Sequence, residues 1–380
     1  MRTLLFTGPG GAGATTSAAA AAVHAARGGR RTLLLSRSPV LMRGLHTVSG
    51  LDVRTVDAQG AFEGLWTTVA GPLAEVLPQV FLPPASSVAP PPGAVVLALF
   101  AELAAADADL VVVDAGPVAE ATELVALSAT LRWWLGQLLP PGMRALAALR
   151  SAAVSSGVAR RGPVDVALQA VPLLEALLRS DRLADPAGTG VVLVAQPRSG
   201  TAAALRRTAL ALGLHGLQSA AVLARVLPEG GSGDWWARRL AEQETALAEL
   251  ADLGPLQRVP ELAAAPEDVA ALAELTPDVG AAAGPLAPVT ERRDGVWQLS
   301  VPLPFADRPD VDLTRWEDDV VITVAGTRRS VDLDPLLRRC EVTGARMDAP
   351  GTAAARLVVS FQPDPQYWPA DLLAAEGRRP

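Results

Sequence analysis

A glycine-rich turn near the start of the chain strongly limits the folds that this sequence can adopt. The apolar run Thr3–Phe6 leads into the glycine-rich stretch Gly8–Gly13, and the alanine-rich stretch Thr16–Ala26 follows. The apolar run has the length of a short buried strand, and the alanine-rich stretch favours a helix. A strand, a tight glycine loop and a helix in this order are typical of the first unit of a parallel α/β sheet.

The loop has the spacing of an anion-binding loop. Residues 8–15 read G-x-x-x-x-G-A-T, whereas the usual phosphate-binding pattern is G-x-x-x-x-G-K-[ST]. Backbone N–H groups in such a loop, together with the positive end of the following helix, bind phosphate oxygens. The predicted nucleotide-binding residues are Gly8, Gly10, Gly11, Ala12, Gly13, Ala14, Thr15 and Thr16.

The cation of this pattern is missing. Ala14 stands at the lysine position, and the chain contains no lysine at all. That ammonium group normally grips the β- and γ-phosphates and offsets charge that develops during phosphoryl transfer. Loss of one charge-assisted contact costs about 1.5–3 kcal/mol of binding free energy. We therefore expect weak nucleotide binding and a larger loss of hydrolysis, or, as the alternative, a tight turn that binds nothing.

Composition excludes several classes of protein. The net charge of -7 and the pI near 5.2 argue against a general nucleic-acid binder. Cys340 is the single cysteine, so the chain has no internal disulfide and no C-x-x-C zinc clasp, and we expect no zinc. His24, His46 and His215 lack neighbours at metal-ligand spacing. Without a signal peptide or an apolar run of about 20 residues, the sequence predicts a cytoplasmic protein.

Apolar runs alternate with helical stretches through residues 1–275, which predicts a doubly wound, mainly parallel sheet. The expected strands are Thr3–Phe6, Thr32–Leu35, Leu110–Asp114, Val191–Ala195, Ser219–Ala224 and Leu256–Val259. Ligands bind at the carboxyl ends of such strands. The segments expected around one site are Gly8–Thr16, Ser36–Pro39, Asp114–Pro117, Gln196–Pro197 and Arg225–Pro228.

Further units are predicted around this sheet. Residues 61–185, apart from one strand, have the composition of a helical subdomain, and the adjacent Trp133 and Trp134 suit its core or a subunit contact. A Gly-, Ala- and Pro-rich stretch predicts a linker at 276–288. Short alternating runs then predict a small β-sandwich at 289–363, followed by a tail at 364–380.

The loop and three later places in the chain resemble the ATPase family that includes the arsenite-pump ATPases and the targeting factors for tail-anchored membrane proteins. The family pattern resembles G-K-G-G-V-G-K-T-T and falls on residues 8–16 position for position, with Pro9 and Ala14 in place of both lysines. The family segment S-T-D-P-A, whose aspartate orients the attacking water, corresponds to residues 36–40, with Ser38 at the aspartate. The family's adenine-side asparagine corresponds to Ala224.

The third landmark, D-T-A-P in the family, corresponds to residues 114–117 and keeps its aspartate. The resemblance implies that Thr15 and Asp114 could hold Mg²⁺, and Arg37 is the nearest candidate for a substitute cation. Three C-terminal segments, at 299–304, 319–326 and 328–335, are similar to an α-crystallin-like, or small heat-shock-protein, domain. The family also implies a dimer formed through the loop face.

These features predict a degenerate member of the anion-transporting and tail-anchor-targeting ATPase family. It would bind ATP and Mg²⁺ weakly, dimerise with itself or with an intact paralogue, and hold an apolar protein client in a chaperone-like role, with peripheral contact to membrane proteins and none to nucleic acid. One alternative is an active ATPase whose arginines replace the lysines. Another is a structural chaperone or assembly protein with a vestigial loop. The sequence leaves open whether the chain is an enzyme.

Overall fold

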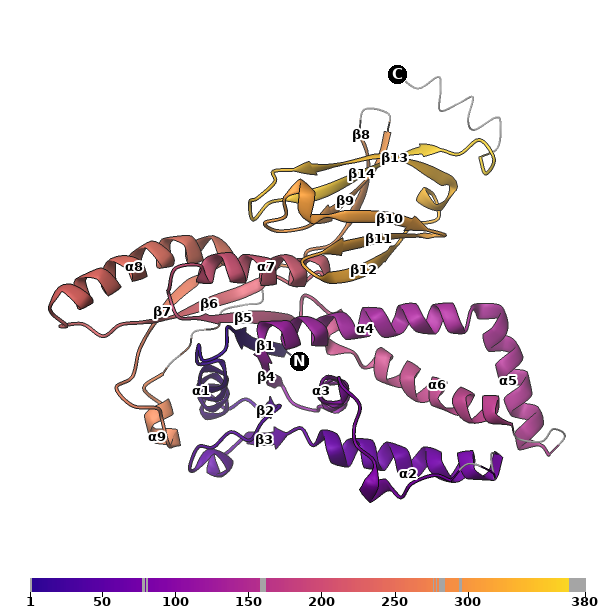
Figure 1. Cartoon of the computed structure of the whole chain (residues 1–380), viewed down its shortest axis with the longest axis horizontal. Helices are drawn as coiled ribbons and strands as arrows, with labels where there is room; N and C mark the ends of the chain where they lie inside the picture. Colours follow the sequence, from indigo (N-terminus) through magenta and orange to yellow (C-terminus); the bar gives the residue numbers. More distant parts are fainter. Residues whose placement is uncertain are drawn as a thin grey trace.

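A parallel sheet forms the N-terminal part of the computed structural model, which describes residues 2–76, 79, 81–157, 162–275, 277, 279, 284–293 and 296–368 (Figure 1). This sheet has seven strands in the order β3-β2-β4-β1-β5-β6-β7. The strands are β1 (Arg2–Gly8), β2 (Thr32–Ser36), β3 (Leu51–Thr55), β4 (Leu110–Pro117), β5 (Thr189–Ala195), β6 (Ser219–Val226) and β7 (Leu256–Pro260). Every neighbouring pair runs parallel, which confirms the predicted fold class.

Helices cover both faces of the sheet, so its central strands are continuous apolar runs. One face packs against α1 (Ala14–Arg27) and the short α9 (Val269–Leu272). The buried side of α1 consists almost entirely of alanines, whose small side chains let the helix lie close to the sheet. The helices on the other face are α3 (Ala94–Ala105), α4 (Val118–Leu138), α7 (Thr201–Leu214) and α8 (Asp234–Leu250).

The edge strand β3 is absent from the strands that the sequence predicts. It reads L-D-V-R-T, and only Leu51 is buried. An edge strand needs fewer apolar residues because one of its sides has no neighbouring strand. The exposed Asp52 and Arg54 form an ion pair of 2.9 Å on its surface. This strand therefore lacks the apolar run that reveals the central strands.

A group of helices extends from one side of the sheet (Figure 1). It contains α2 (Ala58–Val76), α5 (Pro141–Ser155), α6 (Pro163–Arg179) and the distal part of α4. A two-pronged ion pair joins α5 to α6, with Arg150 Nε and Nη2 at 2.6 and 2.9 Å from the carboxylate oxygens of Asp165. None of the described helices combines the length and the apolar character needed to cross a bilayer.

Two antiparallel sheets form the C-terminal β-sandwich, as expected. The larger has the order β13-β14-β9-β8 and the smaller β10-β11-β12. The strands are β8 (Val289–Arg293), β9 (Val296–Pro302), β10 (Asp312–Trp316), β11 (Asp319–Val324), β12 (Thr327–Asp332), β13 (Cys340–Asp348) and β14 (Arg356–Pro363). Fully buried Ile322, Val359 and Phe361 fill the space between the sheets. The alternating runs of the sequence at 296–304, 310–313, 319–326, 328–335 and 356–361 fall on β9 to β12 and β14. The two edge strands of the larger sheet, β8 and β13, are absent from these runs because most of their side chains are exposed.

The sandwich packs on α4 and α7 through its smaller sheet (Figure 1). Leu210 and Leu214 of α7 belong to the same buried cluster as the sandwich core. Arg329 of β12 donates a hydrogen bond to the carbonyl oxygen of Leu214 at 2.6 Å. Residues 276, 278 and 280–283 of the predicted linker and residues 369–380 of the predicted tail lie outside the described residues.

Candidate functional site

The glycine-rich loop leaves β1 between two neighbouring strands. A Cβ atom on Gly8 would collide with the carbonyl oxygen of Val194 in β5, so only glycine fits at this point. Within the loop, Ala12 N–H donates to the carbonyl oxygen of Pro9 at 3.0 Å. Gly13 has a φ of 97°, a left-handed conformation that other residues adopt only with strain. Gly8 and Gly13 are thus required by the backbone path itself.

The helix after the loop begins without a cap. Gly13 is the N-cap residue of α1, no side chain caps it, and no acidic residue stands in the first turn. The first N–H groups of a helix have no partner inside the helix, and they carry its partial positive charge. Ala14, Thr15 and Thr16 therefore present free N–H groups, an arrangement suited to an anion.

Asp114 lies beside this helix end, at the carboxyl end of β4. Its side chain is 5 % exposed, and its Oδ2 accepts hydrogen bonds from the hydroxyls of Thr15 at 2.7 Å and Ser36 at 3.1 Å. Its Oδ1 accepts from Gly116 N–H at 3.3 Å. A hydroxyl and a carboxylate in contact at an anion-binding helix end are the kinds of oxygen ligand that Mg²⁺ takes together with phosphate. Thr15 and Asp114 thus fit the predicted Mg²⁺ site.

The positions of the missing catalytic groups are close to this centre. Ala14, at the lysine position, is the first residue of α1 and offers only a methyl group. Ser38, at the position of the water-orienting aspartate, is exposed, and its N–H donates to Ser36 Oγ at 3.4 Å. Neither side chain can supply the ammonium or the carboxylate that phosphoryl transfer uses in related loops.

Two arginines lie near the loop, and their partners differ. Arg37 forms an ion pair with Glu120 in the first turn of α4, so a carboxylate already compensates its charge. Arg225, at the end of β6, donates from Nη2 to the carbonyl oxygen of Gly11 at 3.3 Å. Arg37 as a substitute cation stays a prediction, but Arg225 is the arginine that contacts the loop. The sequence indicated Arg225 as a site residue because it directly follows the predicted strand Ser219–Ala224.

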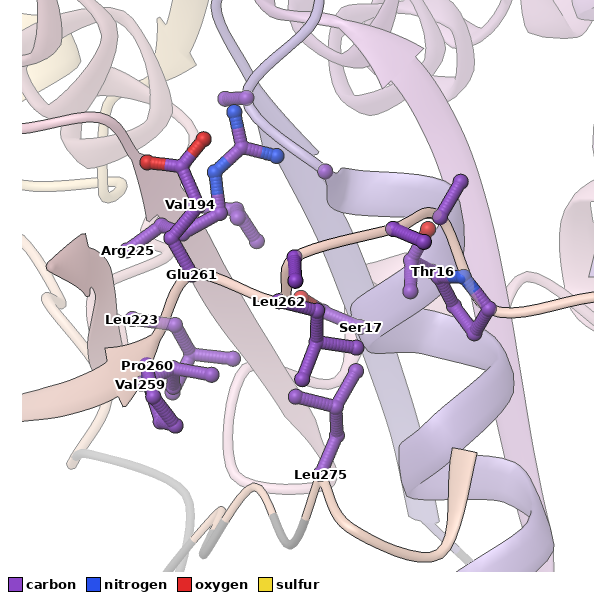
Figure 2. Close-up of a pocket in the computed structure, with 16 residues that line it drawn as sticks. Thr16, Ser17, Val194, Leu223, Arg225, Val259, Pro260, Glu261, Leu262 and Leu275 are labelled. Atoms are coloured by element: carbon purple, nitrogen blue, oxygen red, sulfur yellow. The ribbon is translucent and has the colours of Figure 1, made fainter. Parts of the chain in front are cut away.

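A cavity of about 260 Å³ adjoins the loop on the side of β6 and β7. Figure 2 shows Arg225 and Glu261 at one side of it and Thr16 and Ser17 of α1 at the other. The wall that includes Val259, Pro260 and Leu262 is mainly apolar. An anion-binding helix end beside an apolar cavity can hold a phosphate group next to a flat heterocycle.

The structure brings together most of the segments that the sequence placed around one site. Residues 8–16, Ser36, Asp114 and Arg225 are linked by the contacts described above. The Pro197 carbonyl oxygen accepts a hydrogen bond from Arg239 of α8 at 3.1 Å, and the place of Gln196–Pro197 at this site stays a prediction. Among the described residues, no three His, Cys, Asp or Glu side chains gather into a metal-binding group.

A parallel sheet, a glycine loop and an uncapped helix at the carboxyl end of β1 define the class of P-loop nucleoside-triphosphate-binding folds. A family model described as "Anion-transporting ATPase" matches residues 1–42, and one described as "HSP20-like domain found in ArsA" matches residues 294–361. The chain belongs to this anion-transporting ATPase family and carries the HSP20-like domain, which confirms both resemblances.

Two bacterial proteins are similar along most of their length. Uncharacterized protein SCO2128 of Streptomyces coelicolor is 39 % identical over 97 % of this chain and 99 % of its own. Protein Rv2184c of Mycobacterium tuberculosis is 31 % identical over 84 % of this chain and 80 % of its own. The similarity to SCO2128 spans nearly the whole of both chains, so it covers both the parallel sheet and the β-sandwich of this chain.

Proposed function

We propose that this chain binds ATP weakly at residues 8–16 and has lost most or all of its ATP hydrolysis, so that it acts by binding rather than by catalysis. The proposal rests on one observation. The Thr15 hydroxyl contacts the Asp114 carboxylate at the start of α1, whereas Ala14 and Ser38 stand where the family has the loop lysine and the water-orienting aspartate.

Electrostatics support binding without turnover. The uncapped helix end attracts phosphate oxygens, and Arg225 adds a positive charge on the far side of the loop. A bound Mg²⁺ would neutralise part of the phosphate charge. Thr15 and Asp114 would hold that ion. Nothing at position 14 offsets the charge of the transition state, and this affects hydrolysis more than ground-state binding.

Binding is tested by titrating the full chain with a non-hydrolysable ATP analogue in a calorimeter, with Mg²⁺ and with a chelator. Thr15→Val removes the hydroxyl at nearly constant volume, and Thr15→Ser restores it as the matched control. We expect Thr15→Val to weaken the Mg²⁺-dependent binding at least about tenfold and Thr15→Ser to retain it. Equal affinities for all three proteins would contradict the assignment of this residue.

Turnover is measured in parallel as phosphate released by the purified chain. We expect no release above a control variant in which Gly13→Val blocks the left-handed turn of the loop. Sustained Mg²⁺-dependent hydrolysis by the wild type alone would overturn the proposal. Absence of any nucleotide binding would overturn it as well, and would favour a structural protein with a vestigial loop.

An active ATPase is the second candidate, and the contact from Arg225 to Gly11 favours it. Here Arg225 supplies the cation that the loop lacks. Arg225→Gln should then abolish turnover, while Arg37→Gln, which removes the partner of Glu120, should leave it within about twofold. The opposite result would identify Arg37 as the substitute cation, and unchanged turnover in both variants would exclude the arginine mechanism.

A partner-binding role rests on apolar side chains exposed on the extended helices. These residues are 49–69 % exposed: Leu65, Trp134, Leu138, Met143, Leu146, Leu149 and Leu173. The Trp134 ring contacts Trp133 edge-on, with 4.9 Å between ring centroids, but half of its own surface is open. Apolar surface of this kind marks interaction sites. We propose an apolar protein segment as the client.

This role is tested with a labelled apolar helical peptide of about 20 residues. Serine at both Leu146 and Leu149 should weaken peptide binding, whereas Leu41→Ser, at an even more exposed leucine outside these helices, should not. Equal binding by both variants would exclude the helical surface. Light scattering, with and without the ATP analogue, tests the proposed dimer, and a monomer under both conditions would contradict it.

A further inference from the structure

A second cavity, of about 330 Å³, lies where the β-sandwich meets the ATPase-like part. Its walls come from α4, the turn after α7, residues 285–288 and Arg329 of β12. The charged and titratable side chains that line it are Arg132, His215 and Arg329, and none of its described lining residues is acidic. The chemistry of this cavity is unrelated to the glycine loop.

Arg329 brings an uncompensated charge to this cavity. Its Nη1 donates to the carbonyl oxygen of Leu214 at 2.6 Å. In the described part of the chain, no carboxylate makes an ion pair with it. Burial lowers the pKa of its guanidinium, because removing the charge from water is costly. A partly buried cation without a carboxylate partner is well placed to bind an anion from solution.

The other charges on the cavity are nearly balanced. Arg132 of α4 has its own counter-ion, since its Nη1 lies 3.3 Å from Oδ2 of the fully buried Asp181. The same Nη1 donates to Ser128 Oγ at 3.3 Å. His215 Nε2 lies 3.2 Å from Thr327 Oγ1 of β12. Burial, and then the nearby Arg329 charge, lowers the pKa of His215 to about 4, so the imidazole is neutral at neutral pH.

We propose that this cavity binds a small oxyanion of the phosphate and sulfate class, with Arg329 as its main ligand and Arg132, Ser128 and His215 beside it. A guanidinium offers a planar set of N–H donors that matches such oxyanions. The volume suits an inorganic anion or a small organic phosphate, at the lower limit of known ligand pockets.

The anion would connect the two parts of the chain. Arg329 and Thr327 belong to the sandwich, whereas Arg132, Asp181 and His215 belong to the ATPase-like part. An anion at Arg329 cancels the positive charge that opposes protonation of His215, so it raises the pKa of the imidazole. Binding then takes up a proton, and the affinity for a fully ionised anion rises as the pH falls below neutrality.

The test uses the full chain with sulfate as the probe, because sulfate stays doubly charged across the pH range studied. The chain has three histidines, so replacing His24 and His46 by glutamine leaves His215 as the single imidazole for NMR. Sulfate is added at constant ionic strength. We expect a saturable shift of the His215 signals, a raised His215 pKa, and a higher sulfate affinity at about pH 5.5 than at about pH 7.5.

Arg329→Gln should weaken the sulfate affinity measured at His215 at least about tenfold. Arg328→Gln, at the exposed neighbour on the other side of β12, should leave this affinity unchanged. Sulfate at the glycine loop would not move the His215 signals. If Arg329→Gln does not fold, His215→Gln with calorimetric detection is the second variant, and its sulfate affinity should lose its pH dependence. No saturable shift, or equal responses in both arginine variants, would overturn the proposal.

Discussion

His215 should make the folded chain sensitive to mild acid. Its pKa is about 4 in the folded state, against 6.5 for an unperturbed histidine. The unfolded chain therefore binds a proton that the folded chain does not bind between these values. Protonation favours unfolding as the pH falls, so the contribution of His215 to stability is present above pH 6.5 and is lost progressively toward pH 4.

The magnitude follows from these two pKa values. The full shift corresponds to about 3 kcal/mol, at about 1.4 kcal/mol per pH unit. Lowering the pH from about 7.5 to about 5 should remove about 2 kcal/mol, because the unfolded imidazole is almost fully charged there and the folded one is still neutral. This effect belongs to the junction between α7 and β12, where the His215 ring meets Thr327 and Arg329.

The assay is urea unfolding at a series of pH values, in buffers free of phosphate and sulfate, for the wild type, His215→Gln and His24→Gln. His24 is exposed on α1 and controls for a histidine without this environment. The wild type and His24→Gln should each lose about 2 kcal/mol more than His215→Gln over this range. Carboxylates titrate in all three proteins and cancel in the comparison. Parallel curves for His215→Gln and the wild type would refute a neutral, half-buried His215.

Three further predictions concern the loop and the sandwich. Gly8→Ala should destabilise the chain by about 1–3 kcal/mol in urea unfolding, because its Cβ would collide with Val194 in β5. Gly10→Ala, whose Cβ meets nothing within 4 Å, should leave the stability unchanged. Equal effects of the two substitutions would contradict the close approach of Gly8 to β5. Ala14→Lys should tighten ATP binding in calorimetry by about 10- to 100-fold, and no gain would show that the missing lysine does not limit binding. Phe361→Ala should cost about 3–5 kcal/mol, because this side chain is fully buried in the sandwich core; a loss under about 1 kcal/mol in the same unfolding assay would contradict that packing.

Most of the fold can be predicted from the sequence alone. The central strands β1, β2, β4, β5 and β6 are buried on both faces and are therefore mainly apolar, so they are visible as runs of apolar residues. The edge strands β3, β8 and β13 escaped prediction because partial burial allows polar residues in all three. Burial is decided by the sheet order, and short apolar patterns do not reveal that order.

The sequence also determined the chemical character of the loop. The glycine spacing, the missing lysine at Ala14 and the missing carboxylate at Ser38 are local facts, and the contact of Thr15 with Asp114 follows from the shared carboxyl edge of parallel strands. Which arginine contacts the loop depends on tertiary packing and could not be predicted from the sequence. Arg37 directly follows a strand that ends at the site, but Glu120 compensates its charge. Arg225 instead contacts Gly11, from a strand more than 200 residues further along the chain.

The junction of the two parts could not be predicted from the sequence at all. His215 and Arg329 are each unremarkable in their local sequence, and no spacing rule connects them. They meet because the sandwich packs its β12 strand on α7, which shields both side chains partly from water and places them around one cavity. The chemical groups of a local motif can therefore be predicted from the sequence. Burial and charge pairing between distant residues arise only when distant segments pack together, because both depend on which surfaces exclude water.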